Sequence, residues 1–309
     1  MNDTNVYAVI VTYNGMQWID KSISSLINSS ISVNIIVVDN CSTDNTVNYI
    51  KEKFSQVEII ENKNNLGFGK GNNVGIRIAL EREAEYVFLL NQDAWVEVNT
   101  IHELIKSQRA NLDYGIVSPI HMDGEGTGLQ YNFAGYINMD DCPRLVSDLF
   151  MHSYKPIYEI KFVNAAAWLI TKECIQKAGI FDELTFSHYG EDEDYVIRAS
   201  FYSFKTGVVP SAKIYHDNKG LTWELVKNNL AFRTVHQIIG LKNIKSTFRS
   251  NLLLFLKKSI ENITSAILFR KWKDLMVYIH IMLKTIHKIP VILKARKISY
   301  KQGAFLESK

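Results

Sequence analysis

Apolar and polar positions divide the first ninety residues into alternating strands and helices. Continuous apolar runs, typical of strands buried on both faces, lie at residues 6–11, 33–38, 57–60 and 86–90. Amphipathic spacing predicts helices between these runs, at residues 19–26 and in stretches that end near 54 and 83. Strands that alternate with helices imply right-handed crossovers. The predicted fold class is therefore α/β, with a mostly parallel, Rossmann-like sheet flanked by helices.

The following part of the chain is less regular. Residues 120–160 contain several glycines and Pro143, which predict loops that cover a site. An apolar pattern resumes over 162–172, and a late strand is predicted at 207–210.

Composition adds constraints on class and compartment. The chain has 309 residues, of which 47% are hydrophobic and 22% charged, an ordinary globular composition with enough apolar material for a core. Its three cysteines, Cys41, Cys142 and Cys174, form no Cys-x-x-Cys pair, which argues against a disulfide framework or a structural zinc site and favours a reducing cytosol. The first five residues lack the basic segment of a signal peptide, so the apolar run after them is interpreted as the first core strand.

Two acidic segments, about a hundred residues apart, carry candidate chemistry. The first is Asn91-Gln92-Asp93, directly after the strand at 86–90, and the second is the acidic run 191–194, at the start of a predicted helix. Open α/β sheets bind ligands beyond the carboxyl ends of their strands, so Asp93 is placed to share a hard cation with substrate phosphates. A separate carboxylate nearby can take a proton from an incoming hydroxyl. Together these features indicate group transfer from a nucleotide-activated donor.

Each acidic segment also has an ordinary structural explanation. An isolated Asp after a strand is more often a helix cap, and acids crowd helix N-termini because the helix dipole favours negative charge there. Asp194 and Arg198 also have the spacing of an i,i+4 ion pair. Against this, four successive carboxylates repel one another, which raises a pKa toward that of a useful base. Asn91 in place of a second acid makes the predicted metal site weakly anionic and suited to a loosely held Mg²⁺ or Mn²⁺.

Two further polar segments lie near the predicted strand ends. Asp39 follows the strand at 33–38, where its carboxylate can accept the imide N–H of uracil or thymine, with turn and capping chemistry as the alternative. Residues 64–73 form a Gly/Asn-rich segment whose glycines permit close backbone approach to a nucleotide. The spacing fits neither a dinucleotide fingerprint nor a P-loop, and glycine-rich connectors are common, so this segment alone is weak support.

Six short motifs follow one another along the chain, at residues 11–14, 38–44, 65–73, 90–93, 189–194 and 215–216. In this order they resemble the family 2 glycosyltransferases of the GT-A fold. The resemblance is closest to the rhamnosyltransferase-like and galactofuranosyltransferase-like enzymes of bacterial surface polysaccharide synthesis. It implies a GT-A catalytic domain over residues 1–222, with a nucleotide-binding half at about 1–95 and an acceptor half at about 96–222.

The resemblance also implies roles for individual residues. It places these side chains on the donor side, near the nucleotide: Thr12, Asn14, Asp39, Asn65, Asn72, Asn91, Gln92 and Asp93. Asp93 matches the metal-binding acid of the family's Asp-x-Asp motif, and His216 matches a histidine that completes the metal site in related enzymes. Asp192 matches the catalytic base, with Glu191 beside it on the acceptor side. Trp168 is a candidate for stacking on a sugar, although an aromatic in an apolar run is more often part of the core.

The implied activity is an inverting displacement. Asp192 deprotonates an acceptor hydroxyl, and Mg²⁺ or Mn²⁺ held by Asp93 and His216 stabilises the departing diphosphate. The resemblance implies a UDP- or dTDP-sugar as donor and a lipid-linked oligosaccharide of O-antigen or capsule synthesis as acceptor. The chain departs from the family at Asn91, which stands where the family has the first acid of its metal motif.

Three other classes of protein remain as alternatives. A nucleotidyltransferase usually has a Gly-rich loop with Arg and Lys after the first strand, where this chain has Thr12–Gly15. A catalytically inactive glycan- or nucleotide-binding protein is disfavoured by the presence of both Asp93 and Asp192. A two-carboxylate hydrolase leaves the nucleotide-type segment at 64–73 without a purpose.

The C-terminal region, residues 223–309, is predicted to be helical and basic. Residues 251–297 hold ten Lys or Arg against two acids, Glu261 and Asp274, with apolar residues crowded between them. No charge-free stretch approaches the ~20 residues that span a bilayer. Such helices predict peripheral contact with the membrane, on the cytoplasmic face of the cell membrane. Packing on the catalytic domain or a homodimer contact is the alternative, and nucleic-acid binding is disfavoured because no recognised module accompanies the basic residues.

Overall fold

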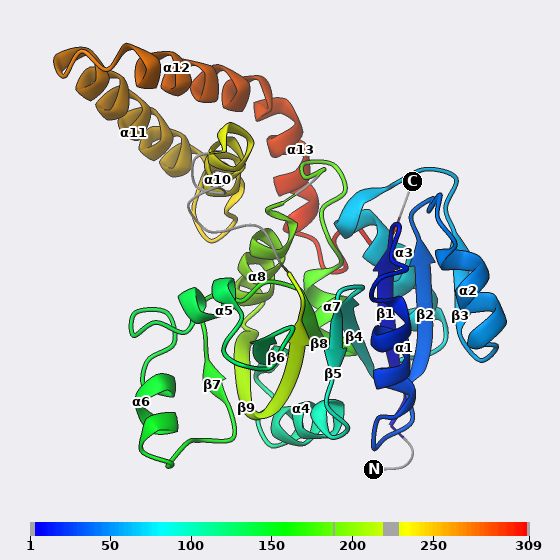
Figure 1. The fold of residues 1–309 in the computed structure, drawn as a ribbon. Helices are drawn as coiled ribbons and strands as arrows, with labels where there is room; N and C mark the ends of the chain where they lie inside the picture. Colours follow the sequence, from blue (N-terminus) through cyan, green and yellow to red (C-terminus); the bar gives the residue numbers. More distant parts are fainter. Residues whose placement is uncertain (1–3, 188, 219–228, 308–309) are drawn as a thin grey trace.

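One sheet lies at the centre of the molecule, between two layers of helices (Figure 1). The computed structural model describes residues 4–187, 189–218 and 229–307. The strands are β1 (Val6–Thr12), β2 (Asn34–Asp39), β3 (Glu58–Glu61), β4 (Tyr86–Asn91), β5 (Ala94–Val96), β6 (Tyr114–Asp123), β7 (Tyr158–Glu159), β8 (Ala167–Thr171) and β9 (Lys205–His216). The helices before β9 are α1 (Ile19–Ile27), α2 (Thr46–Lys53), α3 (Gly67–Glu81), α4 (Thr100–Arg109), α5 (Tyr131–Tyr136), α6 (Leu145–Phe150), α7 (Lys172–Ala178) and α8 (Glu191–Phe201). The helices after it are α10 (Leu230–Lys242), α11 (Phe248–Leu268), α12 (Trp272–His287) and α13 (Ile289–Ser299).

The sheet has the order β3-β2-β1-β4-β8-β6-β9-β5, with β7 paired to β9. Its first four strands, β3, β2, β1 and β4, are parallel to one another, as the alternation of strands and helices predicted. The second half is different, because β8 runs antiparallel between β4 and β6, while β6 and β9 are parallel. The fold is therefore α/β with helices on both faces, but the sheet is mixed rather than mostly parallel.

The predicted elements of the first ninety residues are present, and the irregular stretch contains more structure than its pattern indicated. Residues 120–160 include α5, α6 and β7, and the predicted strand at 207–210 is the middle of the twelve-residue β9. Within the Gly/Asn-rich segment 64–73, α3 already begins at Gly67. A Cβ at Gly75 of α3 would lie 2.4 Å from Val9 Cγ1, so glycine allows this helix to pack closely on β1.

Alternate side chains of β1 enter two separate apolar layers, as expected of a central strand. Val9 packs in the layer that contains buried residues of α3, α7 and α8, whereas Ala8 and Ile10 pack in the layer that contains those of α1, α2 and α4. Full burial of one such aliphatic side chain stabilises the fold by about 1.5–3 kcal/mol. These layers fix the carboxyl end of β1 and its neighbours, where the predicted donor-side residues lie.

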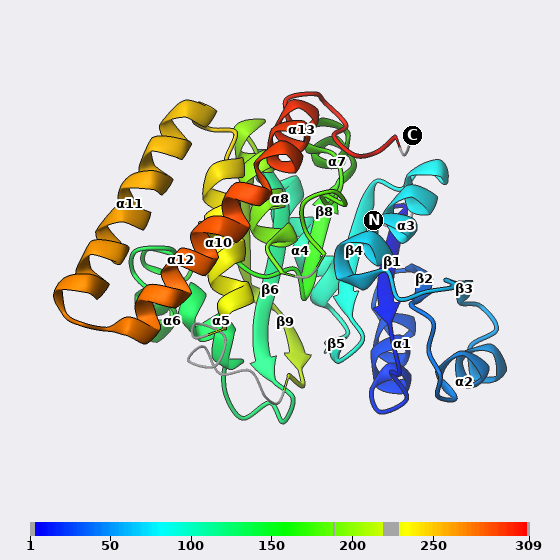
Figure 2. The same ribbon diagram turned by 90° about the horizontal axis from the view of Figure 1, so that it is seen from above.

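The C-terminal helices divide into a part that packs on the sheet domain and a part that extends away from it. α10 packs on α8, and α13 packs on α10, where Arg296 Nη1 donates to the carbonyl oxygen of Lys242 at 3.1 Å. The segment after α13 returns to the domain, where the carbonyl oxygen of Ala304 accepts from Ile180 N at 2.9 Å. α11 and α12 pack on each other and on α10 and extend from the domain as a helical hairpin (Figures 1 and 2).

Among the described helices, none by itself is long and apolar enough to cross a membrane. The pair α12 and α13, bent by 53° at the break between them, passes that test by length and composition alone.

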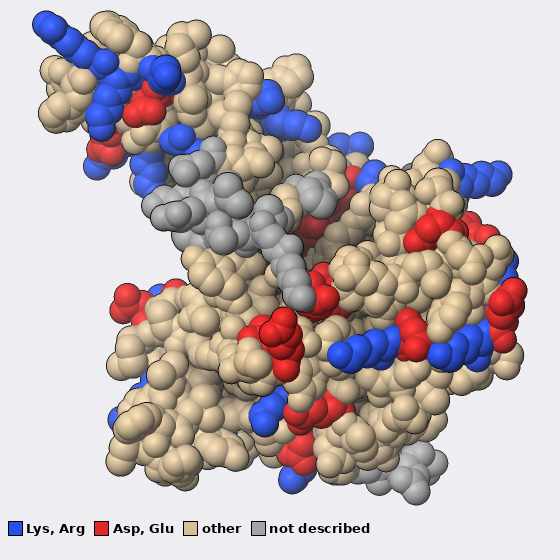
Figure 3. Space-filling view, viewed as in Figure 1, with Lys and Arg blue, Asp and Glu red and all other residues tan. Residues whose placement is uncertain are grey.

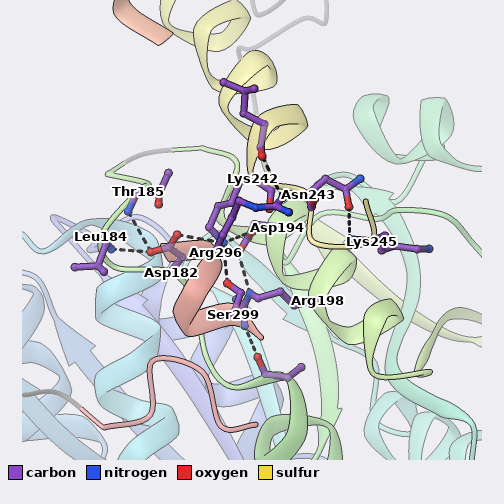
Figure 4. A network of polar contacts seen from close by, with 12 residues as sticks. Asp182, Leu184, Thr185, Asp194, Arg198, Lys242, Asn243, Lys245, Arg296 and Ser299 are labelled. Carbon is purple, nitrogen blue, oxygen red and sulfur yellow. Dashed lines mark hydrogen bonds and ion pairs between the residues drawn. The ribbon is translucent and has the colours of Figure 1, made fainter. Parts of the chain in front are cut away.

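A buried cluster of charges joins the C-terminal helices to α8 (Figure 4). The ammonium of Lys242, at the end of α10 and 1% exposed, forms an ion pair with Asp194 of α8 and lies 3.2 Å from Asp182 Oδ2. Arg198, which is fully buried, donates from Nε to Asp194 Oδ2 at 2.9 Å. Burial acts to raise the pKa of Asp194, but the charges of Lys242 and Arg198 outweigh it and hold this pKa below its ordinary value. Two buried acids are thus balanced by two buried bases.

Candidate functional site

Three predicted site residues from distant parts of the chain line one cleft. Asn91 is the last residue of β4, His216 the last residue of β9, and Asp192 lies in the first turn of α8. The cleft has a volume of about 420 Å³, within the range of ligand pockets. The fold therefore brings one end of the donor-side motif together with the predicted base.

Asp93 and His216 approach each other beside this cleft. β5 pairs with β9 so that Ala94 lies opposite His216, and His216 Nε2 is 3.3 Å from Asp93 Oδ1. Asn91 Nδ2 lies 3.5 Å from the same imidazole nitrogen. His216 is 2% exposed, and its Nδ1 has no hydrogen-bond partner among the described residues.

This pair of side chains fits a divalent cation that also binds a nucleotide diphosphate. A carboxylate suits Mg²⁺ and Mn²⁺, an imidazole favours the transition metal Mn²⁺, and such ions take their remaining ligands from phosphate and water. Within the described part of the chain, no group of three or more His, Cys, Asp or Glu side chains converges as a complete metal site. The metal site predicted at Asp93 and His216 therefore depends on ligands from phosphate and water.

The first turn of α8 carries carboxyl groups whose protonation is shifted toward neutral pH. Burial raises the pKa of Asp192 to about 6, the charge of Glu193 adds to this effect, and backbone hydrogen bonds from Glu193 and Ala165 oppose it. Glu193 N donates to Asp192 Oδ1 at 2.8 Å. A partly buried carboxylate with a pKa near 6 is suited to accept a proton at neutral pH.

Glu191 lies beside Asp192 in the same cleft. It is 6% exposed, and its Oε2 has no hydrogen-bond partner in the part of the chain that the structure describes. Burial, and then the charge of Asp192, raises the pKa of Glu191 to about 7. The two neighbouring carboxyl groups therefore titrate as a coupled pair.

The predicted donor-side residues at the ends of β1, β2 and β4 are connected by hydrogen bonds. Thr12 Oγ1 donates to Gln92 Oε1 at 2.7 Å, which joins β1 to the end of β4. Asp39, 3% exposed, accepts from the backbone N and the hydroxyl of Ser42. Asn14 Oδ1 accepts from Thr43 N at 2.8 Å, so the loops after β1 and β2 are held together around Asp39.

Asn65 stays a prediction, whereas Asn72 does not have the environment that the resemblance implies. Asn65 Oδ1 accepts from Gly67 N at 2.9 Å and thereby forms a turn before α3. Asn72 is 2% exposed, and its amide donates to the carbonyl oxygen of Phe68 inside the same helix. Residues 67–73 belong to a helix, and the side chain of Asn72 is buried on it. Asn72 is therefore not a direct contact to the donor.

Trp168 belongs to the core and not to the cleft. Its side chain is 0% exposed, its ring stacks on Phe181 with centroids 6.4 Å apart, and the ring of Tyr195 lies 6.0 Å away. Trp168 is therefore a core residue. The prediction that it stacks on a sugar is wrong. The aromatic residues that do line the cleft are Phe68, Tyr136, Phe162, Tyr189 and Phe232.

Two asparagines position the site, although the sequence pattern assigned them no role. Asn40 N donates to Thr12 O at 2.7 Å, and its amide donates to Gly67 O at 3.1 Å, so it ties β1 to the start of α3. Asn73, fully buried, donates to the carbonyl oxygen of Phe181 and accepts from its N, both at 2.9 Å. Both asparagines lie within the six motifs, but a motif does not predict the hydrogen-bond partners of its residues.

Solved structures share the fold that positions this site. S. aureus TarS 1–349 in complex with UDP-GlcNAc superposes with a TM-score of 0.58, at 16% identity, over 91% of this chain and 81% of that chain. GalNAc-T7 with UDP, GalNAc and Mn²⁺ superposes with a TM-score of 0.59, at 17% identity, over 76% of this chain and 48% of that chain. At these identities the likeness establishes the fold alone, and the fold is GT-A, as predicted.

Sequence comparison finds similarity to glycosyltransferases. The family model of glycosyl transferase family 2 matches residues 7–156. The dTDP-rhamnosyl transferase RfbF of Shigella flexneri is 26% identical over 218 residues, which are 69% of this chain and 69% of the relative. The match to this family model and the similarity to a rhamnosyltransferase agree with the resemblance found in the sequence.

Proposed function

We propose that this protein is an inverting glycosyltransferase that moves a sugar from a UDP- or dTDP-sugar to a hydroxyl of a lipid-linked glycan in O-antigen or capsule synthesis. One observation carries the proposal: Asp192, with its pKa raised to about 6, lines the same cleft as Asn91 and His216. A base and a diphosphate-binding edge that share a cleft permit attack and departure within one active site.

In the proposed mechanism Asp192 accepts the proton of the acceptor hydroxyl. The oxygen forms a bond to the anomeric carbon as the bond from that carbon to the diphosphate oxygen breaks, and the electron pair leaves with the nucleoside diphosphate. Asp39 lies at the nucleobase end of the donor, where the buried hydroxyl of Thr12 positions Gln92. Because the displacement is direct, it requires no nucleophilic side chain and inverts the anomeric centre.

Asp93 and His216 are the proposed protein ligands of Mg²⁺ or Mn²⁺, with Asn91 beside them. When bound there, the cation neutralises charge that develops on the diphosphate. Support comes from the 3.3 Å approach of the two side chains and from the GalNAc-T7 structure, which contains Mn²⁺ together with UDP.

The tip of the α11–α12 hairpin is the proposed membrane contact. We define the hairpin tip as residues 267–276. Its apolar members are exposed, including Phe269 at 70%, Trp272 at 61% and Met276 at 68%. Arg270, Lys271 and Lys273 lie exposed among them, and Figure 3 shows basic side chains gathered at this end of the molecule. Apolar side chains flanked by bases suit an anionic lipid surface, where each base contributes about 1 kcal/mol.

An interfacial hairpin places the enzyme where a lipid-linked acceptor is confined, on the cytoplasmic side of the cell membrane. Three free thiols support a reducing compartment. A contact between two copies through the same apolar tip is the alternative occupant. An anionic lipid surface uses both the apolar residues and the three bases, which outnumber Asp274, the acid of the tip, so we favour the membrane.

The test of the proposed function is metal-dependent hydrolysis of the donor. Purified full-length protein is incubated with radiolabelled UDP- and dTDP-sugars, with Mn²⁺ or with excess EDTA. We expect slow release of free sugar from one donor, only with the metal present. A nucleotidyltransferase would instead release pyrophosphate, and an inactive binding protein would shift its melting temperature with nucleotide without turnover.

A further inference from the structure

The cleft beside Asp192 is built partly by α10, from the C-terminal region of the chain. Four residues of α10 line it, with the i, i+3, i+4, i+7 spacing of a single helical face: Phe232, Val235, His236 and Ile239. Figure 2 shows α10 alongside α8, whose first turn carries Asp192. The helix that begins the C-terminal region is therefore a wall of the candidate active site.

Contacts at both ends of this face fix α10 against the catalytic turn. A Cβ at Gly190, which has φ +92° at the start of α8, would lie 2.6 Å from Val235 Cγ1, so glycine allows the Val235 side chain to pack directly on the backbone at the start of α8. His236 Nδ1 lies 3.9 Å from Glu193 Oε2. At the end of α10, Lys242 is held by Asp182 and Asp194 in the buried charge cluster. These contacts hold the wall against the start of α8, where Asp192 lies.

The side chains around the cleft combine aromatic rings with amides. Phe232 meets His236 edge-to-face at 4.8 Å between ring centroids, and Tyr136 meets Phe162 edge-to-face at 5.2 Å. The amides come from Asn132, Asn164 and Asn218. A pyranose ring has the complementary chemistry, because its C–H face packs on aromatic rings and its hydroxyls bond to amides.

Tyr136 extends this match. Burial, and then the charges of Asp192 and Glu193, raises the pKa of Tyr136, so its hydroxyl stays protonated and can donate a hydrogen bond. The donor-side residues Asp39, Thr12 and Gln92 do not line this cleft. The cleft is therefore distinct from the nucleobase end of the donor.

We propose that α10 supplies an acceptor subsite, in which Phe232 and His236 bind the sugar ring whose hydroxyl is presented to Asp192. This inference deepens the proposed function and rests on it. It makes the C-terminal region a determinant of acceptor specificity, in addition to any contact of its α11–α12 hairpin with membrane.

The test uses simple sugars as probes, with the full-length protein and Mn²⁺-UDP present. Saturation-transfer NMR is recorded with methyl glycosides of rhamnose, galactose, glucose and N-acetylglucosamine. We expect at least one glycoside to receive saturation on its ring protons. Phe232→Ala should reduce that signal by about fivefold, because it removes one aromatic contact. Phe232→Trp should retain it, since the aromatic face is restored.

Phe150→Ala is the matched control, because Phe150 is 83% exposed on α6 and lies outside the cleft. The signal should be unchanged in this variant. Binding of UDP with Mn²⁺, measured by calorimetry, should be equal in Phe232→Ala and wild type. If nucleotide binds but the glycoside signal is absent or survives Phe232→Ala, the acceptor subsite is wrong. If neither UDP nor dTDP binds the wild type with metal, the proposed function fails instead.

Discussion

His216 Nε2 lies 3.3 Å from Asp93 Oδ1, although the two residues are far apart in the chain. The antiparallel pairing of β5 with β9 places Ala94 opposite His216, so the ends of two strands deliver a carboxylate and an imidazole to one point. Asn91, 3.5 Å from the imidazole nitrogen, completes the polar edge of the cleft. Because Asp192 lies across the same cleft on a different element, the proposed metal ligands and the proposed base can be tested separately.

Replacing either proposed metal ligand should weaken metal-dependent nucleotide binding. Asp93→Ala and His216→Ala should each reduce the affinity for UDP or dTDP with Mn²⁺ by about tenfold or more, measured by calorimetry. Asn91→Asp should be tolerated or should tighten the metal, because it adds a charged ligand. The control is His280→Ala, at an exposed position of α12, which should leave nucleotide affinity unchanged. Full turnover in excess EDTA would overturn the metal assignment.

Asp192→Asn should abolish transfer and leave nucleotide binding intact. Loss of a general base lowers the rate by about 10²–10⁴-fold. The same substitution should stabilise the protein, because ionised Asp192 is held in a site where burial raises its pKa. Near-normal transfer by this variant would exclude Asp192 as the base, and the same assay would then be applied to Glu191→Gln.

Activity and stability should respond to pH in opposite directions. Transfer requires ionised Asp192, so kcat should fall on the acid side with a midpoint at about 6 to 7, set by the coupled pair Asp192 and Glu191. A carboxyl whose pKa is raised on folding contributes stability below its unfolded pKa, and that contribution is lost as pH rises through the folded value.

For Asp192 the window of this stability change runs from its ordinary value of 3.8 to about 6. At about 1.4 kcal/mol per pKa unit, the difference between 3.8 and about 6 corresponds to a loss of about 3 kcal/mol across this window. Urea unfolding at pH 5 and pH 8 should therefore show a smaller difference in stability for Asp192→Asn than for wild type. An equal difference in both proteins would contradict the raised pKa.

Lys242→Met should destabilise the whole domain. The substitution leaves Asp182 and Asp194 buried with Arg198 as the remaining base, and breaking such a buried pair costs about 3–5 kcal/mol. The loss is measured by urea unfolding and should shrink at acid pH, where the carboxylates are protonated. Lys245→Met is the control. Lys245 lies three residues after Lys242 and is exposed, so this substitution should change the free energy of unfolding by less than about 0.5 kcal/mol.

Charged substitutions at the hairpin tip should release the protein from membranes. Phe269→Glu with Trp272→Glu should abolish co-sedimentation with vesicles of phosphatidylcholine and phosphatidylglycerol, and high salt should weaken binding of the wild type. Leu112→Glu, at a 73% exposed site on the sheet domain, should have no effect. Equal sedimentation of the double variant excludes the tip as the anchor, and a concentration-dependent dimer lost in that variant would identify a second copy as the occupant.

Point substitutions serve this test better than removal of the C-terminal region. Arg296 and the carbonyl oxygen of Ala304 are bonded to the body of the protein, so truncation before α11 exposes the buried cluster around Lys242. Loss of donor binding in a truncated chain would then report on folding and not on the membrane.

Much of the donor half could be predicted from the sequence because its determinants are local. The apolar runs of β1, β2 and β4 form parallel strands, and parallel strands end at one edge of the sheet, which places Asp39 and Asp93 there without knowledge of any distant contact. Asp192 was placed at the start of a helix by its neighbours along the chain, and α8 begins at Glu191.

The rest was decided by tertiary contacts between residues far apart in sequence. The apolar residues around Trp168 predict that its strand has a buried face, but they do not identify the residues that cover it. The insertion of β8 between β4 and β6 places Trp168 in the core. Lys242 belongs to a basic region that the sequence assigns to a surface, yet the fold buries it because Asp182 and Asp194 supply compensating charge across the domain. The spacing of apolar residues along α10 predicts one apolar face. The packing of α10 on α8 places that face along the cleft. A side chain's local pattern sets which environment it needs, while the partner that meets the need is fixed only when the chain has folded.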